Sequence, residues 1–436
     1  APPPPGRRGA LSALLLGALA RVGPASPVWY GRDPYDSRTI SACDPDVSVV
    51  GRHTRLRPPD GGAEGCWGVA FDFQGVEVSV RLQGAAWAFA IMEQEDPGEG
   101  RFRSNLFNVH VDGVLRSTFS TATWAGRKDV VVPLVDGVDA NATHDISIVK
   151  LSEPQYNAGH VKSNYVTLLG FVGPTSMRFA APQRRPARKI EFVGDSITAG
   201  YCNAAPALNN ESAQCAVCTD DPKYEWFNMS WPPRLCQDFQ AECHYAAWSG
   251  LGVVQNCCQQ GETFMPSVWK RTLGSFSSLD SNGEIIPNHT PSYNLWDFTT
   301  WVPDLVIMNL GTNDVFGGWT KEVADRYHES YMDVVQFAVQ AYGSRTKFLL
   351  ACGPMTAKNC VAVSKVVEGV RSAAPAVDIM FLNMTKYLND DYGPSRCGHP
   401  STQVDKAMAQ GMLPVVAELM AWHDVHAADL LQSEDA

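Results

Sequence analysis

Four residue types that can together carry out acyl transfer occur along the chain in the order serine, glycine, asparagine and histidine. Ser196 lies in the segment GDSITAG, Gly250 in SGLG, Asn313 in GTND and His399 in CGHP. A serine hydroxyl becomes a strong nucleophile when an imidazole takes its proton. A backbone N–H and a side-chain amide can stabilise the oxyanion that forms when the hydroxyl attacks a carbonyl carbon. These residues therefore indicate acyl transfer, with Ser196 as the nucleophile and His399 as the base.

Buried strands are predicted directly before three of these residues. The strand-like segments are Lys189–Gly194, Glu242–Trp248, Leu305–Gly311, Lys347–Gly353 and Val377–Met384. Segments with helical spacing lie between or after them, the clearest being Tyr327–Tyr342, Val361–Ala373 and Thr402–Trp422. This alternation indicates a parallel sheet with right-handed crossovers and helices on both faces. Active groups in such sheets lie at the carboxyl ends of the strands, where Ser196, Gly250 and Asn313 occur.

The Gly-Asp-Ser triplet has a second interpretation. Asp195 and Ser196 are both residues that commonly cap the start of a helix, and a cap needs no chemistry. The same position also suits a nucleophile, because unpaired N–H groups at a helix start favour negative charge. The glycine, asparagine and histidine at the other strand ends favour the catalytic interpretation.

The first half of the chain has a different pattern, with short segments in which apolar and polar residues alternate. The strand-like segments are Gly68–Phe73, Val76–Leu82, Phe107–Asp112, Asp129–Pro133 and His144–Lys150. Turn residues such as Asp112-Gly113 separate them, and no helical period appears, which predicts a β-sandwich. The chain of 436 residues is long enough for two domains. We expect the sandwich at residues 37–181, a Pro/Arg-rich linker at 182–188 and the α/β domain at 189–425.

Several features predict export. Arg7 and Arg8 precede an apolar run that ends in small residues, and this layout is typical of a signal peptide, predicted here at residues 1–26. The run is too short to span a bilayer, and no other segment is predicted to cross a membrane. Acceptor triplets for N-glycosylation occur at Asn141, Asn210, Asn228, Asn288 and Asn383. We therefore expect a secreted protein.

Charge and cysteine content limit the partners. The net charge of −11 argues against nucleic acid, whose phosphates would be repelled, and leaves neutral glycans open. Twelve cysteines indicate an oxidising compartment and disulfides. Cys215 and Cys218 have a spacing that also fits zinc or redox chemistry, but no second pair or histidine cluster accompanies them. Cys352 and Cys360 flank a short loop and are candidates for a bridge.

The four segments around Ser196, Gly250, Asn313 and His399 resemble those of the GDSL, or SGNH, hydrolases, a family named after these residue types. The resemblance covers residues 189–422. It implies a three-layer α/β/α fold with a flavodoxin-like parallel sheet. It also implies that Ser196 and Gly250, through their backbone N–H groups, and Asn313, through its amide, form the oxyanion hole. No metal or organic cofactor is needed for this chemistry.

A narrower resemblance is to carbohydrate esterase family 2. It lies in the segments KIEFVGDSITAGY from Lys189, AWSGLGV from Ala247 and WDF from Trp296 leading to LGTND. That family places a β-sandwich, or jelly roll, before the hydrolase domain. The resemblance implies removal of O-acetyl groups from an acetylated carbohydrate of the xylan or mannan type.

One position departs from the family pattern. SGNH enzymes usually carry an acid three residues before the histidine, where this chain has Arg396. Such an acid orients the imidazole and stabilises its charged form. Here Asp390 or Asp391 could supply it, or a backbone carbonyl before His399 could orient the ring and leave a Ser-His dyad, which we favour.

Other functions stay open at this stage. The absent acid would also fit a glycan-binding protein with a weakened or inactive hydrolase domain, although such a protein has no use for all four site residues. An esterase for lipid or aryl esters is a further alternative. Trp248 and Trp319 lie near predicted loops and are candidates for stacking on sugar rings, while core packing is the commoner use of tryptophan.

Overall fold

A computed structural model describes most of the chain from Asp36 to Trp422. The described residues are 36–57, 65–94, 104–124, 129–154, 165–208, 210–220, 222–258, 261–282, 285–389 and 391–422. The predicted signal peptide and Asp390 lie outside these ranges. Within them, no helix has both the length and the apolar character that a membrane span requires.

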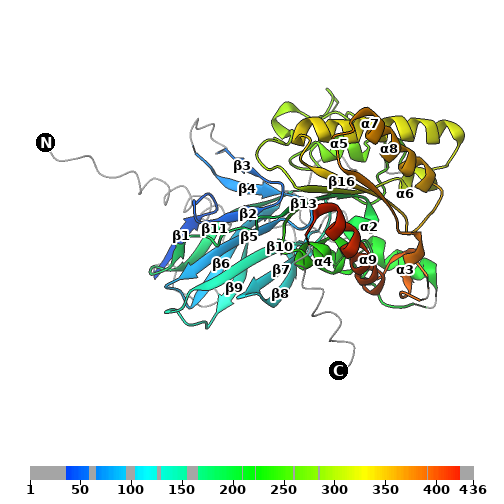
Figure 1. Cartoon of the computed structure of the whole chain (residues 1–436). Helices are drawn as coiled ribbons and strands as arrows, with labels where there is room; N and C mark the ends of the chain where they lie inside the picture. The colour runs from blue at the N-terminus through cyan, green and yellow to red at the C-terminus, as the bar shows by residue number, and fades with distance from the viewer. Residues whose placement is uncertain are drawn as a thin grey trace.

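The N-terminal half forms two antiparallel sheets that pack face to face (Figure 1). One sheet has the order β3 (Thr54–Leu56), β4 (Gly68–Phe71), β11 (Val166–Pro174), β6 (Trp87–Gln94), β9 (Asp129–Asp136), with β1 (Ser37–Ser41) beside β11. The other has the order β12 (Arg178–Ala180), β5 (Glu77–Gln83), β10 (His144–Lys150), β7 (Leu106–Val111), β8 (Val114–Ser120), with β2 (Ser48–Val50) beside β5. The predicted β-sandwich is therefore confirmed.

Alternation of apolar and polar residues accounts for sandwich strands such as β5 and β10. In β5, Val78, Val80 and Leu82 are buried, while the residues between them are only half-buried. Asp112 and Gly113 have positive φ values of 53° and 77°, and Val111 pairs with Val114. This two-residue turn is the tight hairpin connection that an Asp-Gly pair favours.

The C-terminal half contains a five-stranded parallel sheet. Its order is β14 (Glu242–Ala247), β13 (Lys189–Gly194), β15 (Leu305–Asn309), β16 (Lys347–Cys352), β17 (Ile379–Asn383). Every neighbouring pair in this sheet is parallel. Numbered along the chain this is the order 2-1-3-4-5, which is the flavodoxin-like arrangement. All five predicted strands are present, and β13 has the predicted bounds.

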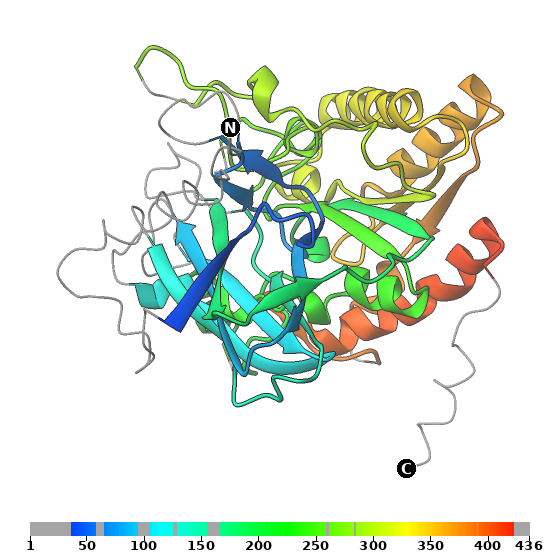
Figure 2. The same cartoon turned by 90° about the vertical axis from the view of Figure 1, so that its left-hand side faces the viewer.

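Helices cover both faces of the parallel sheet, as expected for a three-layer fold. The helices α7 (Lys321–Tyr342) and α8 (Cys360–Ala373) lie on one face, and α4 (Trp231–Asp238) and α9 (Thr402–Met420) lie on the other (Figure 2). In β13, Ile190 and Phe192 pack in the cluster that contains α4 and α9. Val193 points to the opposite face and packs in the cluster that contains α7 and α8.

Short elements complete the fold and carry most of the residues discussed below. The short helices and the small hairpin are α2 (Ser196–Ala199), α3 (Glu211–Asp220), α5 (Met265–Trp269), α6 (Thr312–Phe316), β18 (Ser395–Arg396) and β19 (His399–Pro400). The 3-10 turns are η2 (Thr121–Trp124), η3 (Pro222–Tyr224), η4 (Phe227–Met229), η5 (Ser292–Asn294) and η6 (Thr385–Tyr387).

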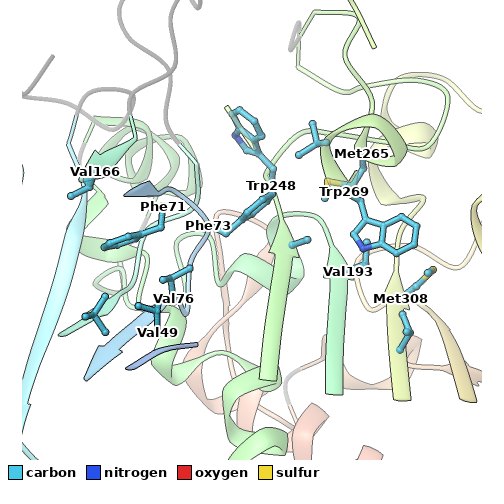
Figure 3. Close-up of a cluster of buried hydrophobic side chains, with 14 of the residues drawn as sticks. Val49, Phe71, Phe73, Val76, Val166, Val193, Trp248, Met265, Trp269 and Met308 are labelled. Atoms are coloured by element: carbon cyan, nitrogen blue, oxygen red, sulfur yellow. The ribbon is translucent and has the colours of Figure 1, made fainter. Parts of the chain in front are cut away.

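The sandwich and the parallel-sheet half share one hydrophobic cluster. Figure 3 shows Phe73 and Val76 of the sandwich in the same buried cluster as Val193 and Trp248 of the parallel-sheet half. Because apolar contact is continuous across the junction, the sandwich packs directly against the layer that contains the predicted catalytic strands.

A buried ion pair adds a polar contact across the same junction. Arg52 lies in the turn between β2 and β3, and its Nη2 is 2.7 Å from Glu191 Oε1 of β13. Both side chains are essentially inaccessible to solvent, and the hydroxyl of Tyr342 donates to the other oxygen of Glu191 at 2.8 Å. Removing one partner of a buried pair leaves an uncompensated charge. The pair therefore favours the arrangement of the two halves in which Arg52 and Glu191 meet.

All twelve cysteines are in the described part of the chain and form six disulfides. The pairs are Cys43–Cys66, Cys202–Cys218, Cys215–Cys397, Cys236–Cys243, Cys257–Cys258 and Cys352–Cys360. The bridge expected for Cys352 and Cys360 is confirmed. Cys215 and Cys218 bond to two different partners, so their thiols are not available to hold zinc or to form a redox pair with each other.

Asp405 of α9 predicts a pH dependence of stability. This carboxyl is fully buried, accepts from Asn203 Nδ2 at 3.1 Å, and its burial raises its pKa from the usual 3.8 to about 8. Between these two values the folded chain holds a proton that the unfolded chain has lost, so the free energy of unfolding falls as pH rises through that window. When the pH is raised from 5 to 9, the free energy of unfolding is expected to fall less in the Asp405→Asn variant than in the native chain. Denaturant unfolding at each pH measures both.

The matched control for this prediction is Asp333→Asn, because Asp333 is an exposed acid on α7. That variant should keep the native pH dependence. An equal loss of stability with pH in the Asp405→Asn variant and in the native chain would contradict the assignment to Asp405.

Candidate active site

Ser196 and His399 lie within hydrogen-bonding distance of each other although they are far apart in sequence. Ser196 is the first residue of α2, directly after β13, and His399 begins β19. The distance from Ser196 Oγ to His399 Nε2 is 2.9 Å. Ser196 is only 4% exposed and His399 is half-buried. This is the distance at which an imidazole can take a hydroxyl proton.

The turn before Ser196 explains how its hydroxyl is presented. Asp195 is the N-cap of α2, and its carboxylate accepts from the backbone N–H of Ile197 at 3.0 Å. A side chain at Gly194 would place its Cβ 2.0 Å from Thr198 Oγ1, so the tight start of the helix requires glycine. The capping interpretation is therefore correct for Asp195, and it leaves the hydroxyl of Ser196 directed at His399.

A backbone carbonyl contacts the other ring nitrogen of His399. Nδ1 lies 2.8 Å from the carbonyl oxygen of Cys397. The carbonyl can only accept, so Nδ1 carries the proton and Nε2 is left to accept from Ser196. Cys397 and Gly398 have φ values of 49° and 71° and join β18 to β19 as a two-residue turn. This turn directs the Cys397 carbonyl back at the ring.

Arg396 and Asp391, the two described positions considered for an orienting acid, make other contacts. The guanidinium of Arg396 donates to the carbonyl of Ala205 at 2.8 Å, and so it braces the histidine loop from outside. Asp391 is exposed, and its backbone N–H donates to the side chain of Asn389 at 2.8 Å. The Nδ1 proton of His399 is directed at the carbonyl of Cys397. The group that orients the ring is therefore this carbonyl, and not the side chain of Arg396 or Asp391.

The loop that carries His399 is tied to α3. Cys397 forms a disulfide with Cys215 of α3, and its backbone N–H donates to Gln214 Oε1 at 2.9 Å. Cys218, one turn further along α3, bonds to Cys202 in the segment after α2. The sequence did not reveal this role of α3. The spacing of Cys215 and Cys218 was its only signal, and it fits the support of a loop as well as it fits a metal site.

Gly250 lies in a loop that is held by hydrogen bonds on both sides. Its φ of 81° is in the left-handed region, which favours glycine. Its carbonyl accepts from the N–H of Cys257 at 3.2 Å. Within the described residues, no acceptor faces the N–H of Gly250. The N–H of Ser196, as the first of a helix, has no intrahelical acceptor either. Both groups are of the kind that an oxyanion hole uses.

Asn313 differs from the sequence-based expectation in its contacts. Its amide nitrogen is 2.9 Å from the carbonyl oxygen of Leu251 and 3.2 Å from Asp195 Oδ2. Both amide hydrogens therefore have acceptors, rather than one being held open for an oxyanion. The contact with Asp195 is the longer of the two and is the one that a bound substrate could replace.

Two buried carboxyls flank this asparagine. Burial, together with the nearby charge of Asp314, raises the pKa of Asp195 to about 7. Burial also raises the pKa of Asp314. The carboxylate of Asp314 accepts from the N–H groups of Val253, Val254 and Gln255 at 2.8 to 3.0 Å. Both acids thus shape the loops around the site.

The two tryptophans considered for sugar contact have different positions. Trp248 is only 6% exposed and packs in the buried cluster of Figure 3, so core packing is the use that the structure shows. Trp319 is half-buried, and its ring meets Tyr327 edge to face with centroids 5.4 Å apart. A residue that the sequence analysis did not single out, Tyr201, meets the ring of His399 edge to face at 4.8 Å.

Comparisons with known proteins agree with this architecture. A model of the GDSL-like lipase/acylhydrolase family matches residues 192–436. A protein named cellulase/esterase CelE from Acetivibrio thermocellus is 25% identical over 394 residues, which are 89% of this chain and 41% of that protein. An acetylxylan esterase/glucomannan deacetylase from Cellvibrio japonicus is 27% identical over 222 residues, which are 48% of this chain and 52% of that protein. The chain thus spans about half the length of these relatives.

Solved structures with the same fold include a family two carbohydrate esterase from Clostridium thermocellum in complex with cellohexaose. It superposes with a TM-score of 0.68 at 22% identity, over 86% of this chain and 99% of that chain. The match extends over the sandwich as well as the parallel sheet, because 86% of this chain is more than the parallel-sheet half contains. The combination of the two halves is therefore shared with that esterase.

Proposed function

Because this chain belongs to the GDSL-like lipase/acylhydrolase family, we propose that it is a secreted serine esterase that removes O-acetyl groups from polysaccharides of the xylan or mannan type. The observation that carries the proposal is the 2.9 Å contact between Ser196 Oγ and His399 Nε2 at the carboxyl end of β13. The names of the relatives, a cellulase/esterase and an acetylxylan esterase/glucomannan deacetylase, support the substrate class.

In the proposed mechanism His399 acts first as a base and then as an acid. Nε2 takes the proton of Ser196 while Oγ attacks the acetyl carbonyl carbon and forms a tetrahedral oxyanion. The bond to the sugar oxygen then breaks, and Nε2 gives its proton to that oxygen. Water, deprotonated by the same nitrogen, attacks the acetyl group on Ser196. Acetate leaves and the proton returns to the serine.

The oxyanion is proposed to bind at the backbone N–H groups of Ser196 and Gly250. Asn313 would join them by exchanging its longer contact, with Asp195, for the oxyanion. One donor of this kind is worth on the order of a hundredfold in rate. The two backbone groups need no rearrangement, and so they supply the preorganised part of the hole.

A Ser-His dyad is proposed in place of a triad. The carbonyl of Cys397 fixes the tautomer of His399, which is one of the two roles that an acid has in a triad. The carbonyl dipole also faces the proton on Nδ1 and favours the imidazolium, although less than a full negative charge would. The disulfide to Cys215 and the contact with Gln214 support this arrangement because they fix the carbonyl in place.

Export to an oxidising compartment is part of the proposal. Six disulfides support it, because such a number is rare in reducing compartments. Four of the five asparagines in glycosylation triplets are exposed, and Asn228 is half-buried. The proposed substrates, plant-type polysaccharides, are also extracellular.

The proposed function is tested by measuring acetate release from acetylated xylan, acetylated glucomannan and a small aryl acetate. We expect release from at least one polysaccharide and its loss in the Ser196→Ala variant. Activity on the aryl ester alone would keep the mechanism but contradict the carbohydrate substrate. Absence of release from all three, with a folded chain, would contradict the esterase and favour a glycan-binding protein.

A further inference from the structure

The sandwich reaches the loop of Gly250 through one buried carboxylate. Glu153 lies just after β10 of the sandwich and is 2% exposed. Its Oε2 accepts from the backbone N–H of Ser249 at 2.6 Å. Ser249 directly precedes Gly250. The sandwich therefore contacts the Trp248–Ser249 peptide group, and the next peptide group along the chain carries the N–H of Gly250. A contact of this length between a carboxyl oxygen and a backbone N–H is among the shorter hydrogen bonds of its kind.

Glu153 is itself held in place on both sides. The fully buried amine of Lys150 donates to the carbonyl of Glu153 at 3.0 Å. The backbone N–H of Glu153 donates to Glu225 Oε1, from the parallel-sheet half, at 2.7 Å. Lys150 therefore orients the segment from the sandwich side and Glu225 from the other side. These contacts limit how far the carboxylate of Glu153 can move.

A second sandwich side chain contacts the end of the strand that leads into this loop. Gln74, which is fully buried in the segment between β4 and β5, donates from Nε2 to the carbonyl of Ala247 at 3.1 Å. Ala247 is the last residue of β14, and Gly250 follows three positions later. On the other side of Gly250, its carbonyl accepts from Cys257. The peptide group of Gly250 is therefore bracketed. On its N-terminal side the sandwich contacts Ala247 and Ser249, and the N–H of Trp248 between them donates to the carbonyl of Gly194 at 3.3 Å.

We infer that the β-sandwich forms part of the catalytic machinery, with Glu153 as a positioning residue that holds the Gly250 N–H in the oxyanion hole and Gln74 as its support. The inference rests on the proposed function and extends it. Oxyanion donors accelerate a reaction only when their direction is fixed before charge develops. Without Glu153 the N–H of Ser249 would lack its acceptor, and the loop could turn to satisfy it elsewhere.

The test compares two variants that each remove one buried sandwich carboxylate from backbone N–H groups of the other half. Glu153→Ala removes the contact with Ser249. Asp72→Ala removes contacts with the N–H groups of Gly274 and Ser275, at 2.9 and 2.8 Å, which lie outside the oxyanion loop. Acetate release from an aryl acetate gives kcat and KM for each, and the native chain is measured first.

Glu153→Ala should lower kcat by about 10- to 100-fold, part of the value of one oxyanion donor, and change KM by less than about threefold. Glu153→Gln should recover most of that loss, because its amide oxygen still accepts from Ser249. Asp72→Ala should keep the native kcat even if it lowers the melting temperature. Equal kcat values for Glu153→Ala and the native chain, or an equal loss of kcat in Asp72→Ala, would overturn the inference.

Amide hydrogen exchange tests the same inference without catalysis. In the peptide that covers residues 248–252, Glu153→Ala should exchange faster than the native chain, whereas Asp72→Ala should not. Gln74→Leu removes the contact with Ala247 and should raise the exchange rate of the same peptide by a smaller factor. This variant replaces Glu153→Ala in the test if Glu153→Ala does not fold. Unchanged exchange in this peptide would overturn the inference. A native chain that releases no acyl group would instead contradict the proposed function, and the exchange data would still decide the positioning role.

Discussion

Replacing Ser196 by alanine is expected to lower kcat for acetate release by about 10⁵-fold, because the variant has no hydroxyl to form the acyl-enzyme. The fold should survive, since Asp195 rather than Ser196 caps α2. KM should change little, because the change removes one small oxygen from a side chain that is only 4% exposed. The measurement is kcat and KM on an aryl acetate, with the melting temperature as a check on folding.

The matched control is Ser372→Ala, the same change at an exposed position on α8. It should leave kcat within twofold of the native value. A Ser196→Ala variant that is folded and keeps more than a few per cent of the native kcat would contradict the nucleophile assignment.

Replacing His399 by alanine is expected to lower kcat by a comparable factor, about 10⁵-fold, because Ser196 then has no base within reach. The two residues act as one unit through the 2.9 Å contact. The double variant should therefore be no slower than either single variant, since groups that act in one step are strongly non-additive. Single-turnover and steady-state rates of the three variants provide this comparison.

Asp391→Asn separates the dyad from a triad. Asp391 is exposed, and the Nδ1 proton of His399 is directed at the carbonyl of Cys397, so this variant should keep the native kcat. A hundredfold loss of kcat in Asp391→Asn would show that an acid orients the base.

For the Ser196 and His399 variants, the contradicting result is a double variant that is slower by the product of the two single effects. That result would show that the two residues do not act together.

The order of the chemistry-bearing residues and the strand ends could be predicted from the sequence because both are local patterns. In β13, a run of β-branched and aromatic residues ends at Gly194, and the nucleophile follows two positions later. The layers follow from the same runs, since a strand buried on both faces needs helices above and below it.

The orientation of His399 could not be predicted in the same way. It depends on positive φ values at Cys397 and Gly398 and on a disulfide to a cysteine 182 residues earlier. Gly398 readily adopts a positive φ, but the residue type of Cys397 does not favour one, and the disulfide partner of Cys397 cannot be read from the residues around the histidine. For the same reason the sequence left open whether an acid or a backbone carbonyl orients His399. The three-dimensional structure shows the carbonyl of Cys397 at Nδ1.

Contacts between the two halves were also beyond a sequence-based prediction. Arg52 and Glu191 are separated by 139 residues, and Glu153 and Ser249 by 96. Trp248 lies next to a glycine loop, which suggested a binding surface, but its side chain is buried in the hydrophobic cluster that the two halves share. The strand β6 was not predicted from the sequence; it is buried almost throughout and lacks the alternation typical of a sandwich strand.

The most direct test of the Ser196–His399 account is covalent labelling with a fluorophosphonate, whose phosphorus is attacked by an activated serine hydroxyl to give a stable adduct. Peptide mapping of the native chain should find one label, on the peptide that contains Ser196, and His399→Ala should label far more slowly. A chain that hydrolyses acetyl esters but carries the label on another residue, or is not labelled at Ser196, would contradict the account.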